Sequence, residues 1–570
     1  MMSGTPRLPR SADAPLVQLF EQRAMVQPHV VAYDVFPTGA RVSAARITWG
    51  ELHRDSRAFA ARLMIAGVDK SDRVVIHAGN RPLWPVADLA LQMIGAIGVG
   101  IFPSSAPAGI RAILDDAAPV LALVDTPEAY ATMCDARREL AASLQITGVS
   151  SDDGASQDWT VWRDEGARAL ATSPGADEAL RRRTASVGLD DIAALIYTSG
   201  STGEPKGAMI SHRYLAASAQ SIAMVLELDA TDSSLSFLPF SHAAERVFGQ
   251  CTRIHAGMSS ALVEDPADLF AVAAAFEPTL FGGLPRIFER LYEAAELARA
   301  GGHDPRAAVA QRIGTRVRVA TSGGAALPTG IAQYLEVLGL SVLGAYGQTE
   351  HLCIAMNRRE SADSTSVGLP MPGTEIRIAP DGEVQVRRSA LTFSGYLNKP
   401  DATAEAFTPD GEWLRTGDEG ELDDAGRLHI TGRLKELIAL STGRKIAPTP
   451  IESGLAASPL IAHAVCHGEG RKYLVVLLSL RRAVVEAWAL REGIGEPWPS
   501  LAQHPRLREQ LQDAVDRVNA GLARTDQIKE FAVTESEFTW ETGELTPTLK
   551  LMRGPVSSRY AGLFNRLHSQ

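Results

Sequence analysis

The segment between residues 192 and 212 limits the possible folds of this chain more than any other. An apolar run, residues 192–197, predicts a buried strand, and a loop of small and hydroxylated residues follows it. In this loop, TSGSTGEPKG (residues 198–207), backbone N–H groups can close around an anion while Lys206 supplies positive charge. The segment therefore predicts a loop that binds phosphate. Because Lys206 follows Pro205 and precedes a glycine, the loop differs from a Walker P-loop.

Strand-like and helical runs alternate through the first three quarters of the chain. Residues 73–77 and 120–125 predict strands, and residues 84–97 are helical in character. After the glycine-rich loop, Ser211 is expected to cap a helix. This alternation predicts an α/β fold with layers of largely parallel sheet. Two further short strands are expected at residues 316–320 and 341–345, and mainly surface loop with some helix is expected at residues 150–190.

The pattern changes after residue 432. Residues 460–467, 472–480 and 528–539 predict strands. A helical stripe is formed by Leu507, Leu511, Val515, Val518 and Leu522. We therefore expect a large N-terminal domain of layered α/β subdomains, residues 1–432, followed by a small α+β domain, residues 433–570.

Charge and composition exclude several classes of protein. The net charge of −11 disfavours nucleic acid or an anionic membrane surface as a partner. The four cysteines lie far apart and form no CxxC pair, which favours a reducing compartment such as the cytoplasm. The N-terminus lacks the apolar core of a signal peptide, and the most apolar window, residues 89–102, is too short to cross a bilayer. We expect a cytoplasmic protein without membrane insertion.

Seven further clusters follow the glycine-rich loop in a fixed order. They are LPFSHAAER (238–246), SGGA (322–325), GAYGQTE (344–350), WLRTGD (413–418), ITGRLKE (430–436), GRKIAP (443–448) and LTPTLK (545–550). Together they resemble the adenylate-forming (AMP-binding) superfamily, most closely its long-chain fatty acyl-CoA synthetase branch. The resemblance extends from Thr48 to Arg553. It implies the fold of an adenylate-forming enzyme, in which a small C-terminal domain moves against a large one.

The resemblance implies a reaction in two steps. The carboxylate of a small-molecule acid attacks the α-phosphate of ATP, which gives an acyl-adenylate and pyrophosphate. A thiol, usually that of coenzyme A as co-substrate, then displaces AMP. The first step brings an anionic nucleophile to an anionic phosphate, so cations such as Mg²⁺ and oriented donors must offset the charge.

The motifs carry implied roles in binding the nucleotide. Thr198, Ser199, Gly200, Ser201, Thr202 and Gly203 match the phosphate loop, and Gly324, Ala325, Tyr346, Gln348 and Thr349 match the contacts to adenine and phosphate. Asp418 matches the residue that binds ribose, and Arg433 matches a second contact to the nucleotide. Glu350 and Thr198 match the Mg²⁺ ligands. Ordinary alternatives exist, since Thr-Gly-Asp is also a common turn and Arg433 could form a surface ion pair.

Three lysines have implied catalytic or conformational roles. Lys550 matches the lysine that reaches the α-phosphate and carboxylate oxygens, a task that suits a point charge on a long stem. Lys206 and Glu350 are expected to assist it. Lys435 falls where the family has its hinge, about which the small domain would rotate between the two steps. The alternative for Lys550 is an exposed lysine near the C-terminus.

The acyl and thiol sites are less well marked. His242 matches the wall or gate of the acyl pocket, and Gly323 with Gly324 would let the substrate approach the backbone closely. Relatives that form acyl-CoA often carry two adjacent glycines where this chain has Thr442 and Gly443, in a loop that lines their pantetheine tunnel. A side chain at Thr442 could narrow that tunnel.

Two other functions remain open. Some relatives adenylate nitrite and pass it to an aryl amine, as diazotases or N-nitrosating enzymes, and such a reaction would not need the tunnel. A non-catalytic module that binds a nucleotide or an acyl group is disfavoured, because it would not need Lys550. The family also suggests a homodimer.

Overall fold

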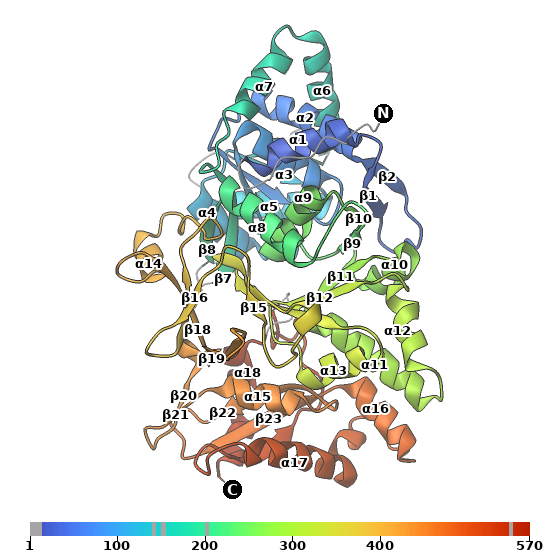
Figure 1. The fold of residues 1–570 in the computed structure, drawn as a ribbon, viewed down its shortest axis with the longest axis vertical. Helices are drawn as coiled ribbons and strands as arrows, with labels where there is room; N and C mark the ends of the chain where they lie inside the picture. The colour runs from blue at the N-terminus through green and yellow to red at the C-terminus, as the bar shows by residue number, and fades with distance from the viewer. Residues whose placement is uncertain (1–13, 139–143, 150–155, 200–204, 547–550, 570) are drawn as a thin grey trace.

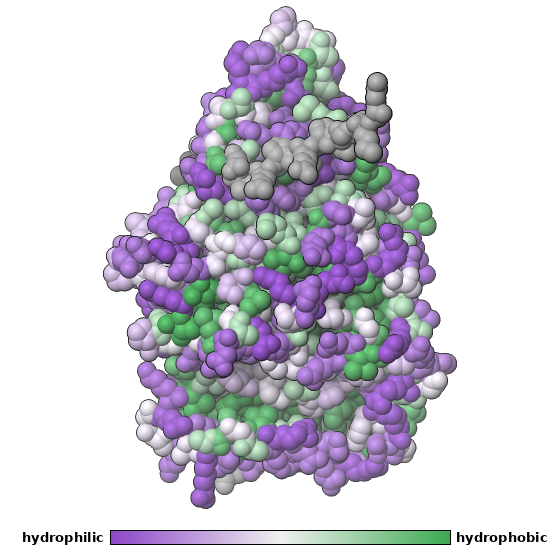
Figure 2. Space-filling model, in the orientation of Figure 1, coloured by the Kyte–Doolittle hydropathy of each residue, from purple (hydrophilic) through white to green (hydrophobic). Residues whose placement is uncertain are grey.

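The chain forms an elongated molecule with its N-terminal half at one end and its C-terminal residues at the other (Figure 1). A computed structural model describes residues 14–138, 144–149, 156–199, 205–546 and 551–569. Several mixed or parallel sheets flanked by helices make up the large N-terminal part, and an α+β unit lies beneath them in the figure. The face drawn in Figure 2 mixes hydrophilic and hydrophobic residues. Among the described helices, none is long and apolar enough to span a bilayer.

The first sheet has six strands in the order β6-β5-β3-β4-β7-β8. All neighbouring pairs are parallel except β7 and β8, which form a hairpin. The predicted strands at residues 73–77, 120–125 and 192–197 all lie in this sheet. The strands are β3 (Arg73–His77), β4 (Ile97–Gly100), β5 (Leu121–Val124), β6 (Gln145–Thr147), β7 (Ile192–Ser199) and β8 (Pro205–Ser211).

Helices cover both faces of this sheet and bury apolar residues against it. Every residue of the helix after β3 is buried, so this helix forms the centre of the large domain's core. Ser211 caps the helix after β8 by accepting from the Tyr214 N–H, as the sequence predicts. The helices are α2 (Trp49–Ile65), α3 (Leu83–Ile94), α4 (Pro107–Ala117), α5 (Pro127–Arg137) and α8 (His212–Val225).

The segment 150–190, expected to be mainly loop, instead contains two helices, α6 (Trp159–Thr172) and α7 (Ala176–Ala185). Each helix buries only two residues, Trp162 and Gly166 in α6 and Leu180 and Thr184 in α7, so neither shows a strong apolar stripe in the sequence. Contacts with α2 stabilise α6: Trp162 is buried, and the Arg62 guanidinium lies 4.2 Å from the centroid of its ring. Tertiary packing therefore supplies the stability that local propensity does not indicate.

Two mixed sheets continue the large domain, in the orders β2-β1-β10-β9 and β11-β12-β13-β14-β15. The strand expected at residues 316–320 begins later, at Val319, and Arg318 directly before it pairs with Asp232. The four-stranded sheet contains β1 (Val31–Phe36), β2 (Ala45–Thr48), β9 (Ser233–Ser236) and β10 (Ser259–Val263), with α1 (Leu16–Val26), α9 (Thr252–Ala256) and α10 (Leu269–Phe276) nearby. The second contains β11 (Leu280–Gly283), β12 (Val319–Gly323), β13 (Val342–Gln348), β14 (His351–Met356) and β15 (Leu369–Pro370), with α11 (Pro285–Ala300), α12 (Pro305–Ile313) and α13 (Thr329–Val337).

An antiparallel sheet links these layers to the C-terminal unit. Its strands are β16 (Ile376–Ile378), β17 (Glu383–Arg387), β18 (Trp413–Leu422) and β19 (Leu428–Arg433), and α14 (Pro400–Glu405) lies between β17 and β18 in the chain. The last strand ends at Arg433, beside the boundary that the sequence predicts.

The C-terminal unit contains the predicted strands and the predicted helical stripe. The stripe residues Leu507, Leu511 and Val515 are buried, but Leu522 lies beyond the end of α17. The strand expected at residues 528–539 ends at Val533. The elements are β20 (Ile438–Ala439), β21 (Lys445–Ile446), β22 (Ile461–His467), β23 (Leu474–Leu480), β24 (Ile528–Val533), α15 (Pro448–Ala456), α16 (Arg482–Arg491), α17 (Pro505–Ala520), α18 (Arg553–Arg559) and α19 (Ala561–Leu567).

Candidate active site

The glycine-rich segment folds as the β7–β8 hairpin. Its register sets Thr198 opposite Lys206 and Ser199 opposite Pro205. Lys206 and Gly207, which the sequence analysis placed in the loop, are therefore strand residues, because β8 pairs with β7 along its whole length. Gly200, Ser201, Thr202 and Gly203 lie outside the described residues, so their expected contacts with phosphate stay predictions.

A second hairpin presents the GAYGQTE motif. Tyr346 and Gln348 belong to β13, and Thr349 and Glu350 form the turn that leads into β14, since Gln348 pairs with His351. This turn requires a glycine at 347, because a Cβ there would lie 1.8 Å from the Leu352 carbonyl oxygen.

Two residues outside the predicted site hold the Glu350 turn. The Tyr214 hydroxyl of α8 donates to the Thr349 carbonyl (3.0 Å) and accepts from the Leu352 N–H (2.9 Å). The Phe393 N–H donates to the Glu350 carbonyl at 2.9 Å. Glu350 is therefore fixed through its backbone, which leaves its side chain to bind other groups.

The predicted ribose ligand is connected to two other predicted contacts. Asp418 of β18 pairs in register with Arg433 of β19, and the Arg433 Nε lies 3.0 Å from the Asp418 Oδ1. The Tyr346 hydroxyl donates to the other carboxylate oxygen at 2.6 Å. Burial and the neighbouring charge of Asp418 raise the pKa of Tyr346 well above its ordinary value, so the phenol stays a donor. Three residues separated by up to 87 positions thus meet around one carboxylate.

The SGGA motif lies at the carboxyl end of β12, next to the end of β13. These two strands are parallel, and Gly323 pairs with Ala345, the residue before Tyr346. Gly324 has a φ of +82°, a left-handed conformation that favours glycine, and Ala325 follows it at the surface. Ligands of parallel sheets bind at such carboxyl ends, so the expected approach of adenine and substrate to this backbone is sterically reasonable.

His242 lies in a different part of the large domain. Its Nδ1 accepts from the Ala244 N–H at 3.1 Å, and its ring meets Phe102 edge-on at 6.2 Å between centroids. Gly100 makes room for this segment, because a Cβ there would lie 2.8 Å from the Ser241 Cα. These contacts suit a residue in a wall between sheet and helix.

The residues of the C-terminal unit occupy three separate places. Lys435 belongs to a single turn of 3₁₀ helix, Leu434–Glu436, directly after β19. Thr442 and Gly443 form the exposed tip between β20 and β21, where Gly443 has a φ of +83°. Lys550 lies outside the described residues. The segment that follows it is fastened to the hinge region, because Arg553 donates to Glu436 (2.9 Å) and to Glu452 (2.6 Å).

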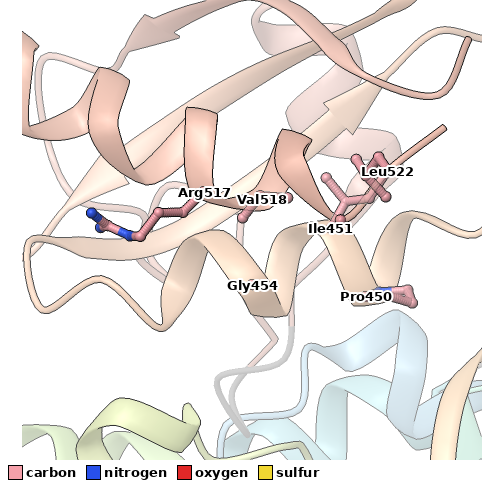
Figure 3. A pocket seen from close by; sticks show the side chains of 7 residues that line it. Pro450, Ile451, Gly454, Arg517, Val518 and Leu522 are labelled. Atoms are coloured by element: carbon pink, nitrogen blue, oxygen red, sulfur yellow. The ribbon is translucent and has the colours of Figure 1, made fainter. Parts of the chain in front are cut away.

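The tip location changes the interpretation of Thr442. With the side chain exposed at a hairpin tip, nothing in the described part of the chain shows a tunnel that Thr442 narrows. An open groove of about 350 Å³ lies elsewhere in this unit, between α15 and α17 (Figure 3). Pro450, Ile451 and Leu522 are among the apolar residues that line it, and no predicted site residue does.

The donor set fits ATP with Mg²⁺. Within the described ranges no cluster of three or more His, Cys, Asp or Glu side chains could bind a metal alone. Mg²⁺ commonly binds through one or two carboxylates together with substrate phosphates, so one carboxylate at Glu350 and one hydroxyl at Thr198 suffice. Lys206 has no carboxylate partner among the described salt bridges and can therefore meet a phosphate.

Comparison with known proteins identifies the family. The AMP-binding enzyme family matches residues 20–397, and the AMP-binding enzyme C-terminal domain matches residues 435–570. The long-chain-fatty-acid–CoA ligase FadD15 of Mycobacterium tuberculosis is 31% identical over 92% of both chains. The peroxisomal long chain acyl-CoA synthetase 7 of Arabidopsis thaliana is 27% identical over 92% of this chain and 82% of its own.

Solved structures share the whole fold. ATP-bound MatB from Rhodopseudomonas palustris superposes with a TM-score of 0.75 at 21% identity, covering 97% of this chain and 99% of its own. The anthranilate CoA ligase AuaEII in complex with anthranoyl-AMP has a TM-score of 0.76 at 20% identity over the full length of both chains. Fold and sequence agree, and the chain belongs to the AMP-binding enzyme family, with the large and small domains of an adenylate-forming enzyme.

Proposed function

We propose that this protein is an ATP-dependent, AMP-forming acid–thiol ligase that converts a long-chain fatty acid to its coenzyme A thioester. The observation that carries the proposal is the 31% identity to a long-chain-fatty-acid–CoA ligase over 92% of both chains. The contacts of Tyr346 and Arg433 with Asp418 support the proposal, because they hold together three residues that are expected to bind the nucleotide.

In the proposed first step, the fatty carboxylate attacks the α-phosphorus of ATP and pyrophosphate leaves. Asp418 would accept hydrogen bonds from the ribose, and Lys206 with the loop that precedes it would offset phosphate charge. Mg²⁺, held by Glu350 and Thr198, would supply further positive charge. Lys550 would approach the reacting oxygens from the small domain.

In the proposed second step, the thiol displaces AMP after the small domain, residues 433–570, has rotated about Lys435. The Thr442–Gly443 tip is part of the rotating domain, so it can be carried toward the site or away from it. We further propose a cytoplasmic homodimer, which cell fractionation and light scattering would test.

ATP–pyrophosphate exchange across a panel of acids tests the proposal. We expect exchange with fatty acids of long chain, weaker exchange with aryl acids, and acyl-CoA formation once coenzyme A is added. Absence of exchange with every carboxylic acid would refute the proposal. The comparisons do not support the alternative in which the enzyme adenylates nitrite. The panel tests this alternative by including nitrite with an aryl amine as a further substrate pair.

A further inference from the structure

Tyr396 belongs to none of the motifs that predict the site, yet it contacts two of the predicted site residues, Glu350 and Lys206. Residues 394–397 run beside β8 as an additional edge. The Ser394 N–H donates to the Met209 carbonyl, the Met209 N–H to Gly395, and the Leu397 N–H to Gly207, each at 2.9 Å. This ladder sets Tyr396 opposite Ala208, two residues from Lys206.

The side chain of Tyr396 contacts both charged residues of the large-domain site. Its hydroxyl donates a hydrogen bond to the Glu350 Oε1. The Lys206 Nζ lies over the face of its ring, 5.4 Å from the centroid, in cation–π range. One phenol thus contacts the carboxylate expected to bind Mg²⁺ and the ammonium expected to bind phosphate.

Neighbouring aromatic and backbone groups hold this phenol in place. The Phe393 ring packs edge-on against it at 4.9 Å between centroids, while the Phe393 N–H donates to the Glu350 carbonyl. A phenol is protonated at neutral pH, so the Tyr396 hydroxyl acts as a donor to the carboxylate.

The two charges do not pair with each other. In the described part of the chain, no salt bridge joins Lys206 to Glu350, although both contact the same ring. A direct pair would direct each charge toward the other and away from its ligand. The phenol satisfies one carboxylate oxygen and gives the ammonium a separate contact.

We infer that Tyr396 is a positioning residue of the adenylation site: its hydroxyl holds one oxygen of Glu350 so that the other can meet a divalent cation, and its ring keeps Lys206 apart from that carboxylate. The inference rests on the proposed function, since it assigns Tyr396 through the roles of those two residues. It predicts that Tyr396 acts on Mg²⁺ binding more than on binding of the acid.

The test is a Mg²⁺ titration of ATP–pyrophosphate exchange in the full-length protein. In Tyr396→Phe, which keeps the ring, we expect the Mg²⁺ concentration for half-maximal exchange to rise about 10-fold, as for a lost charge-assisted hydrogen bond. The KM for the fatty acid should stay within about 2-fold, because neither charge moves far. In Tyr396→Leu, which also loses the ring, kcat at saturating Mg²⁺ should fall by about a further 5-fold.

Tyr197→Phe is the matched control. Tyr197 belongs to the β7–β8 hairpin, beside which Tyr396 lies, and it likewise donates to a carboxylate, that of Asp116, at 2.8 Å. Its ring, however, packs in the apolar cluster of the sheet with Val75 and Val99. It should keep the wild-type Mg²⁺ titration. The urea midpoints of all three variants are measured in parallel.

The outcomes separate the inference from the proposed function. A wild-type Mg²⁺ titration in Tyr396→Phe, with an active wild-type enzyme, overturns the inference and leaves the proposed function intact. Equal changes in kcat, KM and urea midpoint, or the same Mg²⁺ shift in Tyr197→Phe, would also overturn it by showing a structural role. If Tyr396→Phe does not fold, the Mg²⁺ dependence of Tyr396→Leu decides. No exchange in the wild type with any acid would instead refute the proposed function.

Discussion

Two buried arginines show how differently this molecule treats charge inside a domain and between domains. Arg246 and Arg481 are exposed to only 1% and 0%. Arg246 contacts the wholly buried Asp88 of α3 at close range, and Gln92 and Gln250 complete the carboxylate with bonds of 3.0 and 2.9 Å. The pair is short, and Asp88 accepts from three side chains.

Arg481, directly before α16, has only a long contact to a carboxylate, at the place where α16 meets α11. Its Nη2 lies 3.8 Å from the Glu289 carboxylate across the domain boundary, and that atom has no hydrogen-bond partner among the described residues. Its two hydrogen bonds, to the Ser458 and Pro459 carbonyls at 3.1 Å, stay within its own domain. Glu289 has a second partner on its own helix, Arg286.

The difference teaches which charged contacts can be given up. Breaking the short, complete pair inside the core would leave a buried charge uncompensated. The contact across the boundary is longer, and each partner keeps bonds within its own domain, Glu289 with Arg286 and Arg481 with two carbonyl oxygens. A rotation of the small domain could therefore give up this contact more easily. Buried apolar residues of both domains also share one core cluster, so this contact is one part of the boundary.

The largest effect should come from breaking the core pair. Asp88→Asn removes the carboxylate and leaves Arg246 buried without a counter-charge, so the free energy of unfolding should fall by about 4 kcal/mol. Urea denaturation followed by tryptophan fluorescence measures this. A change below about 1 kcal/mol would mean that Arg246 is already compensated by the Gly98 carbonyl, to which it also donates.

Next in size is the loss of the charge that the small domain is expected to bring. Lys550→Ala should lower the rate of adenylation about 100-fold, as for loss of one transition-state donor, while leaving the affinity for ATP within about 2-fold. Single-turnover formation of acyl-AMP and calorimetric binding of ATP separate the two. Lys445→Ala, a lysine of the same domain on β21, provides a control for loss of charge alone.

Acid should destabilise the core of the large domain through a buried histidine. His212 is fully buried, and burial lowers its pKa to about 4 from 6.5. Because the folded pKa lies below the unfolded one, the unfolded chain binds the extra proton between pH 6.5 and 4, and stability falls as the pH drops through that window. The loss should approach about 3 kcal/mol at pH 4 and vanish above pH 6.5.

The pH dependence of urea midpoints in His212→Gln checks this sign. The variant should show a flatter profile between pH 6.5 and 4 than the wild type. His303→Gln, at an exposed position between α11 and α12, should keep the wild-type slope. Equal slopes in wild type and His212→Gln would remove His212 as the source.

The smallest effect should come from the boundary itself. Glu289→Gln makes the same chemical change as Asp88→Asn, but should cost less, about 2 kcal/mol, because the contact to Arg481 is long and Arg481 also donates to two carbonyl oxygens. Urea denaturation compares the two variants directly. A cost as large as that of Asp88→Asn would show that the boundary is as rigid as the core and would argue against rotation of the small domain.

The alternation of strands and helices and the order of the motifs were readable because they depend on local pattern. The strand at 73–77, the Ser211 cap and the buried residues of α17 follow from periodicity and side-chain chemistry. The helix content of residues 159–185 was underestimated, because a few tertiary contacts, such as the burial of Trp162 in the core cluster, stabilise these helices.

Tyr396 was missed for a similar reason. A tyrosine after a glycine is an ordinary feature of a sequence, and only the pairing of residues 394–397 with β8 brings it to Lys206 and Glu350. The segment between the GAYGQTE and WLRTGD motifs contains three aromatic residues, Phe393, Tyr396 and Phe407, and nothing in the sequence distinguishes Tyr396 among them. The distance along the chain, 190 residues from Lys206, hid the contact.

By itself, the sequence determined the family, the two-domain organisation and the types of residue that adenylation requires, because those depend on motifs whose chemistry is local. The tertiary structure decided which of these residues meet: Tyr346 with Asp418 and Arg433, and Glu350 with Lys206 through Tyr396. Such contacts depend on strand register and sheet order, which join segments far apart in the chain. It also decided that the buried Arg246–Asp88 pair is short and the Arg481–Glu289 contact long, since burial and distance are properties of the packed molecule.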